Sequence, residues 1–231
     1  MAWHCSGRSA SELLANLLKA GLLAPELEAA WAAVDRAHFV PRNSVLLAYQ
    51  DTPLALGHGA TISAPHMHAS MLTLLQGHLT PGASFLDVGS GTGIMLALAA
   101  QLVCTPGGGG RAVGIEHIAQ LAEGSLHSLQ AQGLGSLLAS KQVQVVTGDG
   151  RQGWAAAGPY SCIHVGAASP TIPPDLLSQL APLGRLVIPV GVHEQDLLVV
   201  DKAADGSTTQ REVMGVRFVP LCSRIEQEEA S

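Results

Sequence analysis

The sequence has few aromatic residues, few charged residues and no apolar run long enough to cross a membrane. Aromatic residues make up 3% of the 231 residues and charged residues 13%, whereas hydrophobic residues make up 47%. Leu, Val, Ala and Ile must therefore fill the core. The longest apolar stretch, around Ile94–Cys104, is shorter than the roughly 18 residues that a bilayer requires. It predicts a buried helix, and we expect no interaction with membranes.

The sequence also lacks a cluster of basic residues. Its 12 Lys and Arg residues are scattered, and the net charge is −6. Nucleic-acid binding depends on basic surfaces that neutralise phosphates. The composition therefore argues against a nucleic-acid partner, although an acidic total does not exclude a local basic patch.

Cysteine pairs and metal-ligand spacings are absent as well. The four cysteines show no C-x-x-C spacing, so we expect free thiols in a cytoplasmic protein. His66 and His68 form an H-x-H pair without a Cys or acidic partner at ligand spacing, so we expect no metal. Residues 1–7 lack the charged and apolar regions of a signal peptide, which favours a soluble intracellular protein.

The first 60 residues predict helices. Ser9 and Glu12 have capping-box spacing, and the leucines that follow fall on one helical face. A second helix is predicted to open at Pro25. We expect one domain over residues 1–231, with a mainly helical N-terminal extension over 1–60 and an α/β core over 61–231.

From Ser84 onward, strand and helix patterns alternate, which predicts a doubly wound, mostly parallel sheet covered on both faces. A turn signal at Ala203–Gly206 predicts an antiparallel C-terminal hairpin, and Ile225–Glu229 is expected to be a polar tail. The predicted strands are Ser84–Val88, Ala112–Ile115, Val143–Thr147, Tyr160–Val165, Arg185–Val190, Gln195–Asp201 and Glu212–Phe218; the predicted helices are Pro65–Leu79, Ile94–Val103, Ile118–Gln132 and Pro174–Leu180.

A glycine-rich turn connects the first of these strands to a helix. Gly89, Gly91 and Gly93 alternate after Asp87, whereas dinucleotide sites usually have G-x-G-x-x-G spacing. An acid before the turn would repel a pyrophosphate and suits a cationic or zwitterionic group. The pattern resembles motif I of the Rossmann-like methyltransferases, which bind S-adenosylmethionine. A glycine turn without a ligand is the alternative.

Two further acids end predicted strands. Glu116 lies 23 residues after Gly93, where a carboxylate can bind both hydroxyls of a ribose. Asp149, followed by Gly150, can meet the exocyclic amine of an adenine. Each acid alone could be a solvated strand-end residue. All three acids in this order favour a cofactor site.

The block Ala60–His68 lies upstream of the glycine turn. Ser63 is placed to cap the helix that follows, with Pro65 in the first turn. A helix start capped in this way can bind an anion. The alternative is that Ser63 is only a cap.

The Ala60–His68 block and the Asp87–Gly93 loop resemble the protein-L-isoaspartate (D-aspartate) O-methyltransferase family. The resemblance extends along most of the chain through further segments: Met1–Trp3, Ser11–Leu13, Val34–Val40, Gly114–His117, Gly148–Arg151, Ile163–Ala168, Gly184–Gly191 and Met214–Leu221.

The resemblance implies a repair enzyme that methylates the free α-carboxylate of isoaspartyl residues, and the β-carboxylate of D-aspartyl residues, in damaged proteins. It implies a monomer, S-adenosyl-L-methionine as cofactor and S-adenosyl-L-homocysteine as product. It assigns Ser63 the active-site role. The implied cofactor contacts are Ala60, Thr61, Ile62, Ser63, His68, Asp87, Gly89, Thr92, Glu116, His117, Asp149, Gly150, Cys222 and Gln227.

Three of these positions depart from the pattern of the family. Glu116 stands where many relatives have Asp, and Thr92 stands where Ser is common. Cys222 replaces a usual threonine, and a thiol is a weak donor.

The glycine loop alone also allows a methyltransferase that acts on RNA or on a small molecule. The absence of a basic patch and of a base-flipping motif opposes that alternative. A non-enzymatic binding module and an NAD dehydrogenase are further alternatives. The intact acids oppose the binding module, and the glycine spacing opposes the dehydrogenase.

Overall fold

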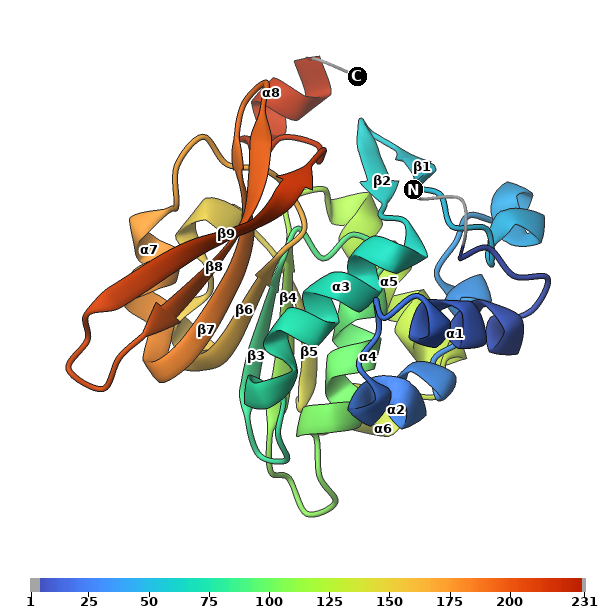
Figure 1. Cartoon of the computed structure of the whole chain (residues 1–231), viewed down its shortest axis with the longest axis horizontal. Coiled ribbons are helices and arrows are strands. Elements are labelled where there is room, and N and C mark those ends of the chain that lie inside the picture. The colour runs from blue at the N-terminus through green and yellow to red at the C-terminus, as the bar shows by residue number, and fades with distance from the viewer. Residues whose placement is uncertain (1–4, 230–231) are drawn as a thin grey trace.

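The computed structural model describes residues 5–229, so the Met1–Trp3 segment lies outside the described part. A seven-stranded sheet forms its centre (Figure 1). Its strands are β3 (Ser84–Val88), β4 (Arg111–Glu116), β5 (Val143–Thr147), β6 (Tyr160–Val165), β7 (Leu180–Gly191), β8 (Gln195–Lys202) and β9 (Thr208–Val216).

The strand order is β5-β4-β3-β6-β7-β8-β9. Strands β3 to β7 pair in parallel, whereas β8 and β9 are antiparallel to their neighbours. The predicted Rossmann-like sheet with antiparallel C-terminal strands is therefore confirmed. The chain runs from β3 outward to β4 and β5 and then returns to β6 on the other side of β3. This reversal makes the carboxyl ends of β3 and β6 the expected place for a ligand.

Helices cover both faces of the sheet (Figure 1). Alternate residues of β3 serve the two faces: Phe85 packs with the core beneath α3 and α4, and Leu86 packs with the core beneath α7. The helices are α1 (Ala10–Lys19), α2 (Glu28–Ala32), α3 (Pro65–Leu75), α4 (Ile94–Val103), α5 (Ala119–Ala131), α6 (Gly135–Ala139), α7 (Pro174–Gln179) and α8 (Arg224–Glu229).

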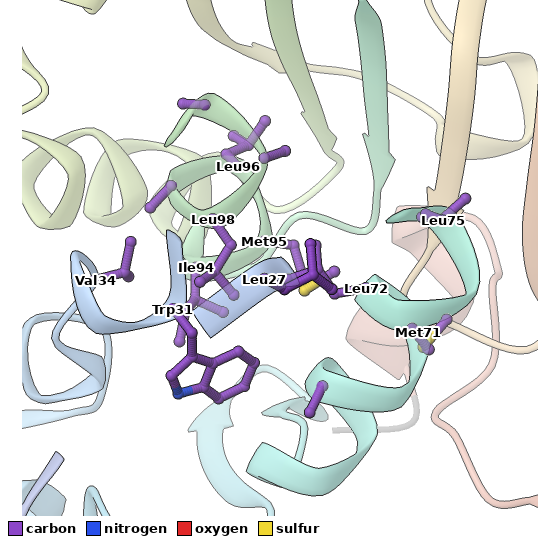
Figure 2. Close-up of a cluster of buried hydrophobic side chains, with 14 of the residues drawn as sticks. Leu27, Trp31, Val34, Met71, Leu72, Leu75, Ile94, Met95, Leu96 and Leu98 are labelled. Carbon is purple, nitrogen blue, oxygen red and sulfur yellow. The ribbon is translucent and has the colours of Figure 1, made fainter. Parts of the chain in front are cut away.

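The N-terminal helices share the core of one sheet face. Figure 2 shows Leu27 beside Leu72 of α3 and Met95 of α4, and Trp31 belongs to the same buried cluster. All four side chains are at most 7% exposed. Burial of such side chains contributes about 1.5–3 kcal/mol each, so the extension is anchored to the α/β core through α3 and α4.

The sequence did not predict two elements, a short hairpin and a C-terminal helix. Both lie at the carboxyl ends of the parallel strands (Figure 1). A short hairpin, β1 (Leu54–Gly57) and β2 (Ala60–Ile62), turns at His58 and Gly59, which have φ of 53° and 66°. The predicted polar tail is instead the helix α8. Ser223 and Glu226 cap each other's backbone N–H at its start, so an S-x-x-E signal was present.

Strand boundaries at the C-terminal end also differ from the prediction. β7 begins at Leu180, where Leu180 pairs with Tyr160 ahead of an irregularity in the ladder. β9 runs over Thr208–Val216 rather than ending at Phe218. The backbone N–H and C=O of Phe218 form hydrogen bonds with the Gln195 side chain instead of with a neighbouring strand. Among the described residues, no helix combines the length and the apolar character needed to span a bilayer.

Candidate active site

The glycine loop between β3 and α4 requires glycine for its backbone conformation. Gly89, Gly91 and Gly93 have φ of 70°, 50° and 82°, a region that side chains disfavour. The N–H groups of Gly89 and Ser90 both donate to the carbonyl of Ile115, which ties the loop to β4. The loop therefore presents a fixed backbone surface at the carboxyl ends of the strands.

Glu116 braces this loop from the end of β4. One carboxylate oxygen accepts from the Gly91 N–H at 3.0 Å, and the other accepts from the Ile118 N–H at 2.9 Å. The residue is 6% exposed. Because a carboxylate oxygen has a second lone pair, both oxygens can still accept a hydroxyl from a ligand.

A cavity opens beside the loop and Glu116. It gathers many of the residues implied as cofactor contacts: Ala60, Thr61, Gly89, Glu116, His117, Gly150, Cys222 and Gln227. It also includes Gly166, Ala167 and Leu221, which were not assigned from the sequence, although two of the quoted segments contained them. These segments are sequential neighbours of β6 and β9, and only the folded chain brings them to the loop.

Gln227 of α8 lines the cavity and bonds across it to two other segments. Its amide nitrogen donates to the His58 carbonyl at 2.6 Å, and its amide oxygen lies 2.6 Å from Nε2 of His117. The cavity volume is about 50 Å³. Gln227 thereby links α8 to the β1–β2 turn and to His117 beside this cavity.

Cys222 lines the same cavity. Its sulfur lies 3.9 Å from the Gln227 amide oxygen. Burial, with the charge of Glu226, raises the pKa of the thiol. The group is therefore a weak, uncharged donor at neutral pH.

Asp87 lies beneath the loop instead of in the cavity wall. It is 1% exposed, and one carboxylate oxygen lies 2.7 Å from Nδ1 of the equally buried His164. The other carboxylate oxygen has no hydrogen-bond partner within residues 5–229. Unpartnered buried acceptors are costly, so this oxygen is a candidate acceptor for a cationic ligand group.

Asp149 turns away from the cavity toward Arg151. Its carboxylate accepts from Nε of Arg151 at 3.0 Å and from Nη2 at 2.7 Å. These hydrogen bonds lower the pKa of Asp149. Its neighbour Gly150 keeps a place in the cavity wall. A Cβ atom at Gly150 would meet Cγ1 of Val88 at 2.6 Å.

Ile62 and Thr92, also implied as contacts, do not line the cavity. Ile62 is buried in the main core, and Thr92 is half-buried on the glycine loop.

A second, larger hollow adjoins the cavity. It has a volume of about 1,020 Å³, with Ser63 and His66 on one wall and Gln195 and Phe218 on the other. Thr61 and Val219 line both this cleft and the cofactor-type cavity. A small ligand in the cavity and a polypeptide segment in the cleft can therefore meet beside these residues, as a group transfer requires.

Ser63 does not cap α3, contrary to the sequence prediction. The N-cap residue is Ala64, and Asp51 performs the capping role through one oxygen. That oxygen accepts from the His66 N–H at 2.9 Å and lies 2.8 Å from Nδ1 of His66. The Ser63 hydroxyl forms no hydrogen bond within the described chain and borders the cleft, so it is available to a ligand.

His68 lies behind Ser63 and does not reach either hollow. Its Nδ1 lies 3.2 Å from Nη1 of Arg36, and the residue is 5% exposed. Burial and, next, the charge of Arg36 hold the pKa of His68 well below its ordinary value. His68 is therefore neutral at physiological pH. Among residues 5–229, no group of three His, Cys, Asp or Glu side chains is arranged to hold a metal ion.

Comparisons with known proteins converge on one family. A sequence model of protein-L-isoaspartate(D-aspartate) O-methyltransferase matches residues 8–226. The chain is 49% identical over 216 residues to protein-L-isoaspartate O-methyltransferase 1 of Arabidopsis thaliana, covering 93% of this chain and 92% of that protein. It is 44% identical to the protein-L-isoaspartate O-methyltransferase of Caenorhabditis elegans, with 98% of each chain covered.

A solved structure shares the whole architecture. The protein-L-isoaspartate O-methyltransferase of Plasmodium falciparum, crystallised with S-adenosyl-L-homocysteine, superposes with a TM-score of 0.85. It is 29% identical, and the superposition covers 94% of this chain and 99% of that chain.

Proposed function

The chain belongs to the protein-L-isoaspartate(D-aspartate) O-methyltransferase family, and we propose that it methylates the free α-carboxylate of L-isoaspartyl residues in damaged proteins. The methyl donor is S-adenosyl-L-methionine. The β-carboxylate of D-aspartyl residues is a second acceptor. The methyl ester then closes to a succinimide without the enzyme, and hydrolysis of the succinimide returns part of the product to aspartate.

The single observation that carries this proposal is the junction of cavity and cleft. Thr61 and Val219 border both, and the free Ser63 hydroxyl lies in the cleft near that junction. A wide cleft suits a polypeptide acceptor, and an adjoining small cavity suits the donor. An acceptor carboxylate in the cleft would therefore meet a methyl group presented from the cavity.

The residues around the cavity fit S-adenosylmethionine. Glu116 has free lone pairs for ribose hydroxyls, and Asp87 has a buried oxygen without a partner that suits the amino group of the methionine part. When bound, the cofactor supplies an electrophilic methyl group on a sulfonium.

The reaction needs little from the protein beyond orientation. A carboxylate with a pKa near 4 is already ionised at neutral pH, so no general base is required. The Ser63 hydroxyl donates a hydrogen bond to one carboxylate oxygen and leaves the other oxygen free to attack. Catalysis then consists of holding the attacking oxygen in line with the methyl group and its leaving sulfur.

The proposal extends to the organisation of the chain. Residues 1–231 act as one methyltransferase domain, because the N-terminal helices pack into the same core as the sheet. The resemblance to the family supports a monomer in the cytoplasm.

A pair of peptides tests the function. Labelled S-adenosylmethionine should transfer its methyl group to an isoaspartyl peptide but not to its aspartyl twin, and equal labelling of both would refute the proposal. Adding an RNA and small-molecule panel separates the alternative methyltransferases.

A serine pair tests the role of Ser63. Loss of one hydrogen bond to a charged group costs about 1.5–3 kcal/mol, so Ser63→Ala should lower kcat/KM roughly 10- to 100-fold. Ser70→Ala is the matched control, because the Ser70 hydroxyl bonds only to the His66 carbonyl within the same helix. An unchanged kcat/KM for Ser63→Ala would remove Ser63 from the mechanism.

A further inference from the structure

Arg36 is a buried cation that borders neither the cofactor cavity nor the cleft, yet it contacts the block that forms them. It lies in a 3₁₀ helix, Arg36–His38, and is 4% exposed. Its Nη2 donates to the Ser63 carbonyl at 2.8 Å, and its Nη1 lies 3.2 Å from Nδ1 of His68. One guanidinium therefore binds two residues of the Ala60–His68 block at once.

An arginine at this position carries a desolvation cost to the fold. Burial lowers the pKa of Arg36 to about 10, against the opposing effect of Asp51, so the side chain remains charged at neutral pH. Its Nε has no partner in the described chain. Desolvation of a buried ion often exceeds the attraction that it gains, so burial of this guanidinium is itself unfavourable.

The two contacts have a direct consequence for Ser63. Arg36 donates a hydrogen bond to the Ser63 carbonyl from the buried side. Asp51 accepts from the His66 N–H at the start of α3, which a serine cap would otherwise bind. The hydroxyl of Ser63 is thereby relieved of any structural hydrogen bond while its main chain is held in place. A fixed backbone with a free hydroxyl is what orientation of a carboxylate requires.

The contact with His68 fixes a second group. A guanidinium only donates, so Nδ1 of His68 must be an acceptor and the ring proton must sit on Nε2. His68 lies in the first turn of α3, in the same block as Ser63. Arg36 therefore ties the Ser63 carbonyl to the first turn of α3, at His68.

We propose that Arg36 is a positioning residue for methyl transfer: its guanidinium fixes the Ser63 main chain and the His68 ring together, which holds the Ser63 hydroxyl in place at the cleft. The inference rests on the proposed function of Ser63. It predicts that the planar two-pronged head group is needed, and that a positive charge alone is insufficient.

Arg36→Lys tests this requirement, with Arg185→Lys as the matched control. Arg185 also donates to a carbonyl of α3, that of Leu74, at 2.9 Å, and pairs with Asp201 at 2.6 Å, but at the far end of the helix. Misplacement of reacting groups by 1 Å can cost about 100-fold in rate. We expect a loss of that order in kcat for Arg36→Lys, little change in KM, and near-normal kinetics for Arg185→Lys.

Arg36→Met guards against a lysine variant that fails to fold, since an apolar side chain of similar length can fill the site. Circular dichroism and urea unfolding establish that each variant is folded. A folded Arg36→Lys or Arg36→Met enzyme with wild-type kcat would overturn the proposal. So would a loss of activity that Arg185→Lys shares.

A double-variant cycle supplies a readout that a merely structural role would not change. If Arg36 acts through Ser63, combining Arg36→Lys with Ser63→Ala should lower kcat no further than the worse single variant, within about twofold. Fully multiplicative losses would overturn the proposal. Equal labelling of isoaspartyl and aspartyl peptides would instead refute the proposed function, and the cycle would still decide the role of Arg36 on any acceptor that is methylated.

Discussion

Replacing Ser63 with alanine should leave the stability of the fold almost unchanged, although the residue lies at the start of α3. A serine that caps a helix contributes about 1 kcal/mol through its hydroxyl. Ser9 is such a cap, because its oxygen accepts from the Glu12 N–H at 3.2 Å. Ser63 has no such contact, so its substitution should cost less than about 0.5 kcal/mol, as surface substitutions do.

Asp51 should show the opposite behaviour. One carboxylate oxygen accepts from the backbone and from the ring of His66, and the residue is 1% exposed. Hydrogen bonds to charged groups contribute about 1.5–3 kcal/mol each. Asp51→Ala should therefore lower the free energy of unfolding by on the order of 3 kcal/mol.

Urea unfolding of Ser9→Ala, Ser63→Ala and Asp51→Ala measures the three losses on one scale. The m-values should stay equal, which makes the midpoint shifts comparable. The expected order is a loss of about 1 kcal/mol for Ser9, almost none for Ser63 and the largest for Asp51. A loss for Ser63→Ala equal to that for Ser9→Ala would refute the reasoning, because Ser63 would then be a cap.

Three further outcomes follow from the site. Glu116→Gln should weaken S-adenosylmethionine binding roughly 10- to 100-fold in calorimetry, because an amide cannot accept both backbone N–H groups; an unchanged Kd would contradict this. Gly150→Ala places a Cβ atom 2.6 Å from Val88, so it should lower the free energy of unfolding by about 1–3 kcal/mol and weaken cofactor binding. Gly124→Ala on α5 is the control: its Cβ atom meets nothing within 4 Å, and it should raise the free energy of unfolding by about 0.5–1 kcal/mol in urea unfolding. The folded-state pKa of His68 is well below its ordinary value of 6.5. Below pH 6.5 the unfolded chain therefore binds a proton that the folded chain does not. The free energy of unfolding then falls as the pH drops below 6.5, by up to about 1.4 kcal/mol per pH unit. His68→Gln should remove this component from unfolding curves at pH 7, 6 and 5, and an identical slope would contradict the assignment.

Local patterns in the sequence determined the sheet and the cofactor side of the site. The alternation of strands and helices from Ser84 predicts a parallel sheet, and parallel strands bring their carboxyl ends to one edge. Asp87 and Glu116 could therefore be placed near the glycine loop from strand ends alone. Each of these inferences needs only residues close together in the chain.

The contacts that complete the site depend on the tertiary structure. Ser63 had the residue type and the position of a cap, yet Asp51, which precedes His66 by 15 residues, caps α3 through the His66 N–H. Arg36, 27 residues before Ser63, donates to the Ser63 carbonyl. The Gln227 side chain beside the cavity donates to the His58 carbonyl, 169 residues away. The sequence by itself determined the class of fold and placed Asp87 and Glu116 at the strand ends beside the glycine loop, because those follow from local periodicity. Only the tertiary structure decided which hydroxyl is free and what holds it in place, because those depend on side chains brought together from distant parts of the chain.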